Sequence, residues 1–350
     1  MKSGSNDGTR AGGRQNAVAR PLRFGTNTGS TPQGMPLALT RRPNTLAQPW
    51  ISNIGVTDVT LAPGGTIEDC TFNAHPVLRI IYGAHWTART ADGLFEYHPG
   101  DAGLPLYFGP NAHAMPLSVH GSFRVVTVNF VPGASSAFDV PPQPETVDRI
   151  YRMDPISGSP APLPGYEPKA DVRDWLDAVD NQLCEALAAA DPAPPHDLMA
   201  AFETASLTDP SLRLDDFARA RGVSRRTLER IIRREWGLSP AEALRRARGL
   251  DLAALLLGVA LEEEEQDLRL RYFDEPHMIR EMRHFFAMTP GQLRNGSHPL
   301  LRITMEIRQS RRVELLERIA AGQLAPWRDP GAEPGGPDPA APGGLSRKAS

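Results

Sequence analysis

The chain has 350 residues, and 38 Lys and Arg against 41 Asp and Glu give it a formal net charge of -3. Such a balance by itself points to neither nucleic acid nor a membrane surface as a partner. The two cysteines, Cys70 and Cys184, are too few for a disulfide scaffold and lack the pairing of a CxxC redox site or a zinc site. No apolar stretch approaches the roughly 20 residues of a membrane-spanning helix. These features predict a cytoplasmic protein with no membrane segment.

Residues 1–48 are rich in Gly, Ser, Asn, Thr, Arg and Pro and show no sustained periodicity. A segment of this composition buries too little apolar surface to offset the conformational entropy lost on ordering, so it is predicted to be a disordered arm. Arginines including Arg41 and Arg42 make the arm basic. A solvated tail is the simpler interpretation, and contact with phosphates is the alternative. Residues 326–350 are similarly rich in Gly and Pro and are predicted to be a disordered tail.

Residues 49–135 contain short β-branched and aromatic runs, such as HPVLRIIYG and FRVVTVNFVPG, separated by turn residues. This spacing predicts an antiparallel β-barrel or sandwich whose interior can hold a small ligand. Residues 136–196 are a proline-rich connector with a predicted helix at 171–190, which is interpreted as a linker or a dimer contact. The chain then reads as helical, with an extra helix in residues 295–325. That helix is expected to pack against the body or a second protomer rather than DNA.

The most informative pattern is LRLDDFARARGVSRRTLERIIRREWGLSP, which starts at Leu212. A first short helix is followed by Gly222 at the turn, and Ser224 is a natural N-cap for a second helix that Gly237 ends. Within the second helix, apolar residues at helical spacing form a buried stripe, which leaves the arginines on exposed faces. The pattern predicts a helix-turn-helix unit, residues 214–236, with an arginine-bearing second helix suited to the DNA major groove.

The sequence from GVSRRTLERIIRREWGLSP through the connecting helix, together with YFDEPHMIREMRHFFAMTPGQLR, resembles the AraC-type transcriptional regulators. The resemblance implies a DNA-binding domain at 197–294 with two helix-turn-helix units joined by a long helix, the second unit at 261–286. It implies base contacts and phosphate contacts by different residues. The base-contacting positions are Arg226, Glu229, Arg230, His277 and Arg280. The phosphate contacts are assigned to Arg225, Arg233 and Arg234.

The second unit departs from the family pattern because Glu262–Glu265 are consecutive acids where small, apolar residues are usual. Residues 258–294 contain eight acids and five arginines, whereas residues 211–257 contain six acids and eleven arginines. Carboxylates facing DNA repel its phosphates. The first unit is therefore expected to dominate DNA affinity. Phe273, Met278, Met282, Phe285 and Phe286 are expected to be core, and a metal-binding role for His277 is not expected.

The N-terminal unit resembles the cupin-type sensory domain of many AraC-like regulators, on the stretches FEYHPGD, LYFGPNAHAMPLSV and FRVVTVNFVPGA. Metal-dependent cupin enzymes carry an HxH pair, which is absent among His75, His85, His98, His113 and His120. No catalytic residue, metal site or cofactor is therefore predicted. Two alternatives remain open: a metal-dependent cupin enzyme fused to a helical domain, and an interaction protein whose second DNA unit has decayed.

The resulting prediction is a multidomain α+β protein, with a cupin-like antiparallel β-barrel followed by an all-α domain with two helix-turn-helix units. Its function is predicted to be sequence-specific transcriptional regulation rather than catalysis. The implied partners are double-stranded DNA, a small-molecule effector, a second protomer in a homodimer, and RNA polymerase if the protein is an activator.

Overall fold

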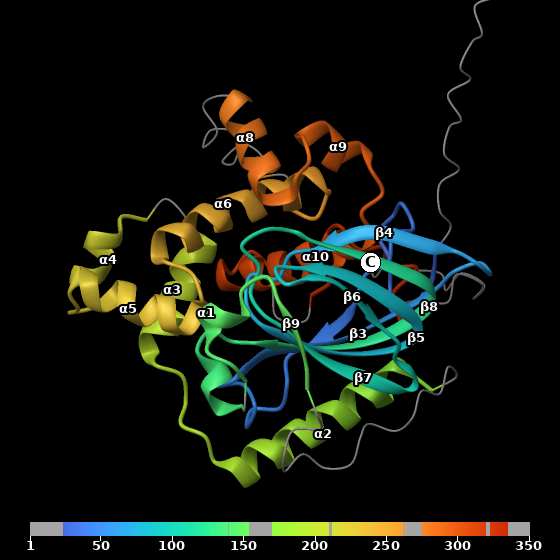
Figure 1. Ribbon diagram of the computed structural model, residues 1–350, viewed down its shortest axis with the longest axis horizontal. Helices are drawn as coiled ribbons and strands as arrows, with labels where there is room; N and C mark the ends of the chain where they lie inside the picture. Colours follow the sequence, from blue (N-terminus) through green and yellow to red (C-terminus); the bar gives the residue numbers. More distant parts are fainter. Residues whose placement is uncertain are drawn as a thin grey trace, which may run out of the picture.

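The computed structural model describes residues 24–138, 140–153, 170–209, 212–261, 263, 275–319 and 323–334. The described part has a β-rich N-terminal half and a helical C-terminal half, which lie side by side (Figure 1). The multidomain α+β class predicted from the sequence is confirmed. None of the described helices combines the length and hydropathy of a membrane span.

The nine described strands form one antiparallel sheet. They are β1 (Gly25–Thr26), β2 (Leu39–Arg41), β3 (Ile51–Thr60), β4 (Thr66–Thr71), β5 (Val77–Thr90), β6 (Gly93–Tyr97), β7 (Gly100–Phe108), β8 (Met115–Phe130) and β9 (Ile150–Arg152). The order β1-β3-β8-β5-β7-β9 has two ends, so the hydrogen-bonded path of the described strands stays open rather than closing into a barrel. The long strands β5 and β8 form its centre. Alternation along them places one set of side chains on a buried face and the other set outside.

The helical elements follow the sheet. They are η1 (Ala134–Ala137), α1 (Gln143–Thr146), α2 (Val172–Ala190), α3 (Asp197–Thr208), α4 (Leu214–Ala220), α5 (Arg225–Trp236), α6 (Pro240–Leu256), α8 (Glu275–Phe286), α9 (Pro290–Asn295) and α10 (Pro299–Leu315). The predicted helix of the connector is α2, and its apolar stripe packs on the sheet through Trp175 and Val179. That stripe is buried within this chain, so it is not available as a dimer contact.

The prediction of a disordered arm at 1–48 is wrong for residues 24–48, while residues 1–23 lie outside the described ones. Strands β1 and β2 pair with β3, and Leu37 and Ala47 are fully buried. Arg41 forms ion pairs with Asp177 and Asp180 of α2, at 2.8 and 2.6 Å. Although the segment is polar on average, its few apolar residues are buried against the sheet. Its Arg41 is paired with carboxylates of α2, a helix distant in sequence.

The prediction of a disordered tail at 326–350 is wrong for residues 326–334. Trp327 is buried, and the Arg328 guanidinium donates to Glu306 of α10, to Glu333 and to the carbonyl of Ala38. The segment therefore fastens α10 to the start of the chain. Residues 335–350 lie outside the described ones.

The extra helix expected in residues 295–325 is α10. It packs on the body of its own chain, which is one of the two arrangements expected from the sequence. Its N-terminus is capped by Asp69 of β4, whose carboxylate accepts hydrogen bonds from the backbone N–H groups of Leu300 and Leu301 at 2.7 and 3.1 Å. Farther along the helix, Arg308 donates to Asp251 of α6 at 2.6 Å. Helix α10 thus contacts both halves of the molecule.

Candidate nucleic-acid interface

Helices α4 and α5 form the helix-turn-helix unit that the sequence predicts. Gly222 has φ +65° at the turn, a left-handed conformation that favours glycine. The Ser224 hydroxyl accepts the backbone N–H of Thr227 at 3.1 Å, and Gly237 ends α5 with φ +73°. Leu228 and Ile232 are fully buried, so the stripe they form fixes which face of α5 is turned outward.

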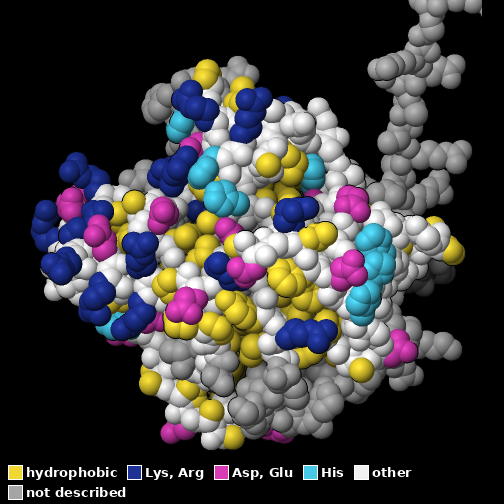
Figure 2. All heavy atoms as spheres, in the orientation of Figure 1, with side chains coloured by type: hydrophobic (Ala, Val, Ile, Leu, Met, Phe, Trp, Pro, Cys, Tyr) yellow, Lys and Arg dark blue, Asp and Glu magenta, His cyan; other side chains and the backbone are white. Residues whose placement is uncertain are grey.

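The outward face of α5 is basic. Arg226, Arg230 and Arg233 are exposed, and their i, i+4 and i+7 spacing places them on one side of the helix. Within the described residues, Arg226 and Arg230 have no ion-pair partner, so their guanidinium groups are available to a ligand. Figure 2 shows Lys and Arg side chains crowded at this end of the molecule, over α4 and α5.

The other charged residues predicted on α5 are already paired within the chain. Arg225 is half-buried and forms ion pairs with Glu229 at 2.9 Å and Asp215 at 3.2 Å. Arg234 is exposed and lies beside Glu235. These exposed pairs are weak, since surface ion pairs contribute about 0–1 kcal/mol, and they exchange readily for phosphate or base contacts.

Helix α8 carries the second set of predicted contact residues. Arg280 and His277 are exposed, and His277 Nε2 lies 3.8 Å from Glu281 Oε1. Glu281 is buried and also accepts three hydrogen bonds from Arg245 of α6, the shortest at 2.7 Å. Hydrogen bonding to Glu281 raises the pKa of Arg245 above its ordinary value. This clamp fixes α8 against α6, and the helical pattern of the sequence does not reveal it.

The acidic run Glu262–Glu265 lies outside the described residues, except for Glu263. Phe273, one of the predicted core residues, also lies outside them. Among the other predicted core residues of the second unit, Met282, Phe285 and Phe286 are buried and Met278 is half-buried, as expected. Helices α6 and α8 approach closely at Gly249, where a Cβ atom would stand only 2.6 Å from the Phe285 ring.

The end of α8 is seated on the β-rich half. The rings of Phe286 and Phe285 lie 5.2 and 6.2 Å from the ring of Phe72, which follows β4, and the backbone N–H of Ala114 donates to the Phe285 carbonyl at 2.7 Å. These contacts join the second helix-turn-helix unit to the sheet. Any displacement of the sheet relative to α8 therefore changes the packing of the second unit.

Helix α6 is anchored to the same part of the sheet by Arg246, which is buried. Its guanidinium donates to the backbone carbonyls of Asn111 at 2.8 Å and Ala74 at 2.6 Å. Burial, which removes the cation from water, lowers the pKa of Arg246 to about 9. The two carbonyls offset part of that cost, and their fixed positions set the place of α6 on the sheet.

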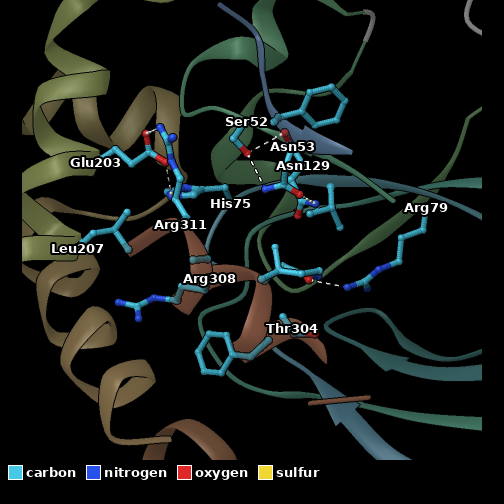
Figure 3. Close-up of a pocket in the computed structure, with 16 residues that line it drawn as sticks. Ser52, Asn53, His75, Arg79, Asn129, Glu203, Leu207, Thr304, Arg308 and Arg311 are labelled. Carbon is cyan, nitrogen blue, oxygen red and sulfur yellow. Dashed lines mark hydrogen bonds and ion pairs between the residues drawn. The ribbon is translucent and has the colours of Figure 1, made fainter. Parts of the chain in front are cut away.

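A cavity of about 70 Å³ lies between the two halves. Figure 3 shows Glu203 and Arg311 facing each other on one side of it, with His75 beside them and Arg79 on the opposite side. Burial raises the pKa of Glu203 and lowers the pKa of His75 well below its ordinary value. The cavity therefore holds ionisable side chains in surroundings that exclude water, and it touches both the sheet and α10.

Arg308 and Arg311, which also line this cavity, form ion pairs with Asp251 and Glu203. Arg79 of β5 instead has neutral hydrogen-bond partners. Its Nη2 donates to Asn73 Oδ1 at 2.8 Å and to Thr71 Oγ1 at 3.1 Å, and its guanidinium lies over the Phe108 ring. Burial lowers the pKa of Arg79 to about 10. No carboxylate pairs with it among the described residues. An anion reaching this point would compensate the half-buried charge of Arg79.

Comparison with known families gives one match for the helical half: residues 217–296 match a family described as a helix-turn-helix domain. The matched range starts within α4 and ends just after α9, so it includes both sets of predicted contact residues. The chain therefore carries an AraC-type helix-turn-helix domain. Transcription regulation and DNA binding are the activities of this domain type. No curated protein matches the chain.

Solved structures resemble the chain only distantly. Apo ToxT from Vibrio cholerae is 11% identical, with a TM-score of 0.41 over 72% of this chain and 98% of that one. ToxT with bound unsaturated fatty acid is 11% identical, with a TM-score of 0.38 over 74% and 99%. Oxalate decarboxylase from Bacillus subtilis is 16% identical, with a TM-score of 0.21 over 31% and 28%. We draw no functional conclusion from likenesses this distant.

Proposed function

We propose that the protein is a sequence-selective transcriptional regulator that binds double-stranded DNA mainly through its first helix-turn-helix unit. The exposed arginine face of α5 carries this proposal. Arg226 and Arg230 are unpaired within the described residues, and the buried stripe beneath them holds the helix in a fixed orientation. Arginine is suited to this role because its planar fork of donors matches guanine O6 and N7.

The assignment of contacts follows the resemblance to the AraC-type regulators, and the exposure of these side chains supports it. We assign Arg226, Glu229 and Arg230 of α5, with His277 and Arg280 of α8, to base edges. Arg225, Arg233 and Arg234 are assigned to phosphates, which fix register and contribute affinity without sequence selectivity. In this assignment a DNA phosphate replaces Glu229 as the partner of Arg225. The carboxylate of Glu229 is then able to accept a hydrogen bond from a cytosine amino group.

Selection of preferred sites from a random DNA pool tests the proposal directly. The full chain is expected to enrich one sequence pattern, and the variant Arg226→Ala/Arg230→Ala is expected to lose both the enrichment and most of the affinity. Arg89→Ala is the matched control, because Arg89 is an exposed arginine on the sheet. Enrichment of no pattern, or equal enrichment by the double variant, would contradict the proposal.

We further propose that the cavity between the halves receives an anionic small-molecule effector, whose carboxylate or comparable group pairs with Arg79. At about 70 Å³ the cavity is small for an organic ligand. An effector must therefore widen it by moving α10 from the sheet. That movement acts on α6 through Arg308 and Asp251, and so shifts the population of DNA-competent arrangements.

A panel of small carboxylates, tested by thermal shift and by DNA affinity, examines the effector role. Binding is expected to weaken at least tenfold in Arg79→Gln, while the same variant retains DNA binding without effector. Arg152→Gln, which removes an exposed arginine of β9, is the control. If a carboxylate stabilises the wild type and Arg79→Gln equally, the effector does not bind at this cavity.

A further inference from the structure

Three histidines form a row across adjacent strands on the outer face of the sheet. His85 of β5 is the register partner of His120 of β8, and the pairing of Trp86 with Tyr97 places His98, just after β6, opposite His85 on the other side. The imidazole rings of His85 and His120 are stacked, with centroids 4.2 Å apart and planes 6° apart, and the His98 ring lies 5.5 Å from that of His85.

The row points away from the buried core. The neighbouring residues Trp86, Tyr97 and Val119 belong to the core cluster beneath the sheet, so alternation turns the three histidines to the opposite face. His98 is exposed, and His85 and His120 are half-buried. Figure 2 shows histidine side chains gathered in a column over the sheet, on the opposite side of the view from the arginines of α4 and α5.

Carboxylates border this row. Glu96 lies 3.5 Å from His98 Nε2, and Glu68 of β4 lies in the adjacent row, joined across the sheet to Glu96 through the register partners Ser118 and Thr87. The Thr66 hydroxyl lies 3.4 Å from His120 Nδ1, so Nε2 is the ring nitrogen that this contact does not use. A cation at the row would meet imidazole nitrogens with the carboxylate of Glu96 nearby.

We propose that this histidine row binds a borderline transition-metal ion such as Zn²⁺, with His85 and His120 as the chelating pair and His98 completing the site. Within the described residues, no group of three His, Cys, Asp or Glu side chains is placed to hold a metal ion, and the rings of His85 and His120 lie nearly parallel, so the proposed site requires these side chains to rotate. Opposed residues on antiparallel strands have Cβ atoms about 4.5–5.5 Å apart, so rotation of the rings brings two nitrogens within the roughly 2.0–2.1 Å reach of one ion without backbone movement. Imidazole is a preferred ligand for Zn²⁺, Ni²⁺ and Cu²⁺.

This site is different from the interior metal site that an HxH pair would signal. The sequence positions 85, 98 and 120 show no ligand spacing, because the three residues meet only through cross-strand register. The site is also distinct from the proposed DNA and effector sites, so its test does not depend on them.

Isothermal titration of the untagged full chain with ZnCl₂ at pH 7.5 tests the site. The wild type is expected to bind one equivalent, and His85→Gln/His120→Gln to bind at least tenfold more weakly. The matched control is His113→Gln/His284→Gln, which removes another pair of contacting imidazoles, 5.1 Å apart, and should leave the affinity unchanged. Because protons compete for imidazole, wild-type binding should also weaken at pH 5.5.

A second variant guards against misfolding of the first. His98→Gln changes an exposed side chain and is expected to weaken Zn²⁺ binding several-fold without altering the melting temperature of the metal-free protein. The proposal is overturned if the wild type binds no Zn²⁺, or if His85→Gln/His120→Gln and the control lose binding equally. It is also overturned if the His85→Gln/His120→Gln variant is folded and binds Zn²⁺ as tightly as the wild type.

Discussion

The two helix-turn-helix units are attached to the molecule in different ways. The first unit has its own core, in which Phe202 of α3 packs against Phe217 and Trp236, and it contacts the β-rich half at the end of α5, where the Trp236 ring lies 4.7 Å from the ring of His75. Its arginine face is turned to solvent. The second unit borrows its packing from the sheet, since the end of α8 rests on Phe72. The difference suggests a division of labour, in which the first unit supplies DNA affinity and the second reports the position of the N-terminal half.

The largest expected effect comes from removing the ring of Phe72, on which the end of α8 packs. Phe72→Ala deletes a buried ring and should lower the free energy of unfolding by about 3–5 kcal/mol. Hydrogen exchange should show faster exchange in α8 than in the wild type, with α5 unchanged. Phe217→Ala is the matched control, with faster exchange in α4 and α5 instead. Faster exchange of both units in Phe72→Ala would mean that they unfold together and that the contrast drawn above is wrong.

The next effect compares one arginine from each recognition helix. Arg230→Ala is expected to weaken binding to the selected DNA site by about 1–3 kcal/mol, and Arg280→Ala by clearly less. The reason is the charge around each residue, since residues 211–257 have an excess of arginines and residues 258–294 an excess of acids. Fluorescence anisotropy at fixed salt measures both, with Arg89→Ala as the control. Equal losses from the two substitutions would remove the asymmetry.

A smaller effect separates phosphate contacts from base contacts within α5. Arg233→Ala should weaken binding to selected and unrelated DNA alike, and lower the slope of log affinity against log salt by about 0.9. Arg230→Ala should instead reduce the preference for the selected site. The two variants are compared on both DNAs across a salt series. A loss of preference in Arg233→Ala would reassign that residue to a base.

The sequence predicts the first unit well because its determinants are local. Ser224, Gly222 and Gly237 act through their own backbone, and the apolar stripe of α5 needs only helical spacing to be recognised. The base and phosphate roles remain predictions, although every residue proposed for base contact is exposed.

Other features depend on contacts between distant residues, which composition does not contain. Arg328 stands in a Gly- and Pro-rich segment, yet its guanidinium donates to Glu306 and to the Ala38 carbonyl. The seat of α8 likewise joins Phe72 to Phe286. Local patterns identify a helix and its buried face, but they do not identify the surface that covers that face.

The smallest predicted effect is the pH dependence of the stability that His298 contributes. It again distinguishes how the two helix-turn-helix units are attached to the sheet. Hydrogen bonding to Asp69, at 3.2 Å, raises the pKa of His298 above its ordinary 6.5. A raised folded-state pKa means that the stabilisation is complete below the unfolded pKa of about 6.5 and is lost as pH rises through the folded value. His298→Gln should therefore destabilise the protein by roughly 1 kcal/mol at pH 6 and by less at pH 8.5.

Urea unfolding at the two pH values measures this difference, and hydrogen exchange locates it. His298 and Asp69 join the start of α10 to β4, so the loss should appear in α10 and not in α5. His196→Gln is the comparison, because His196 caps α3 through its ring nitrogen, at the base of the first unit. If the pH-dependent loss in His298→Gln spreads to α5, the first unit depends on the sheet as much as the second does.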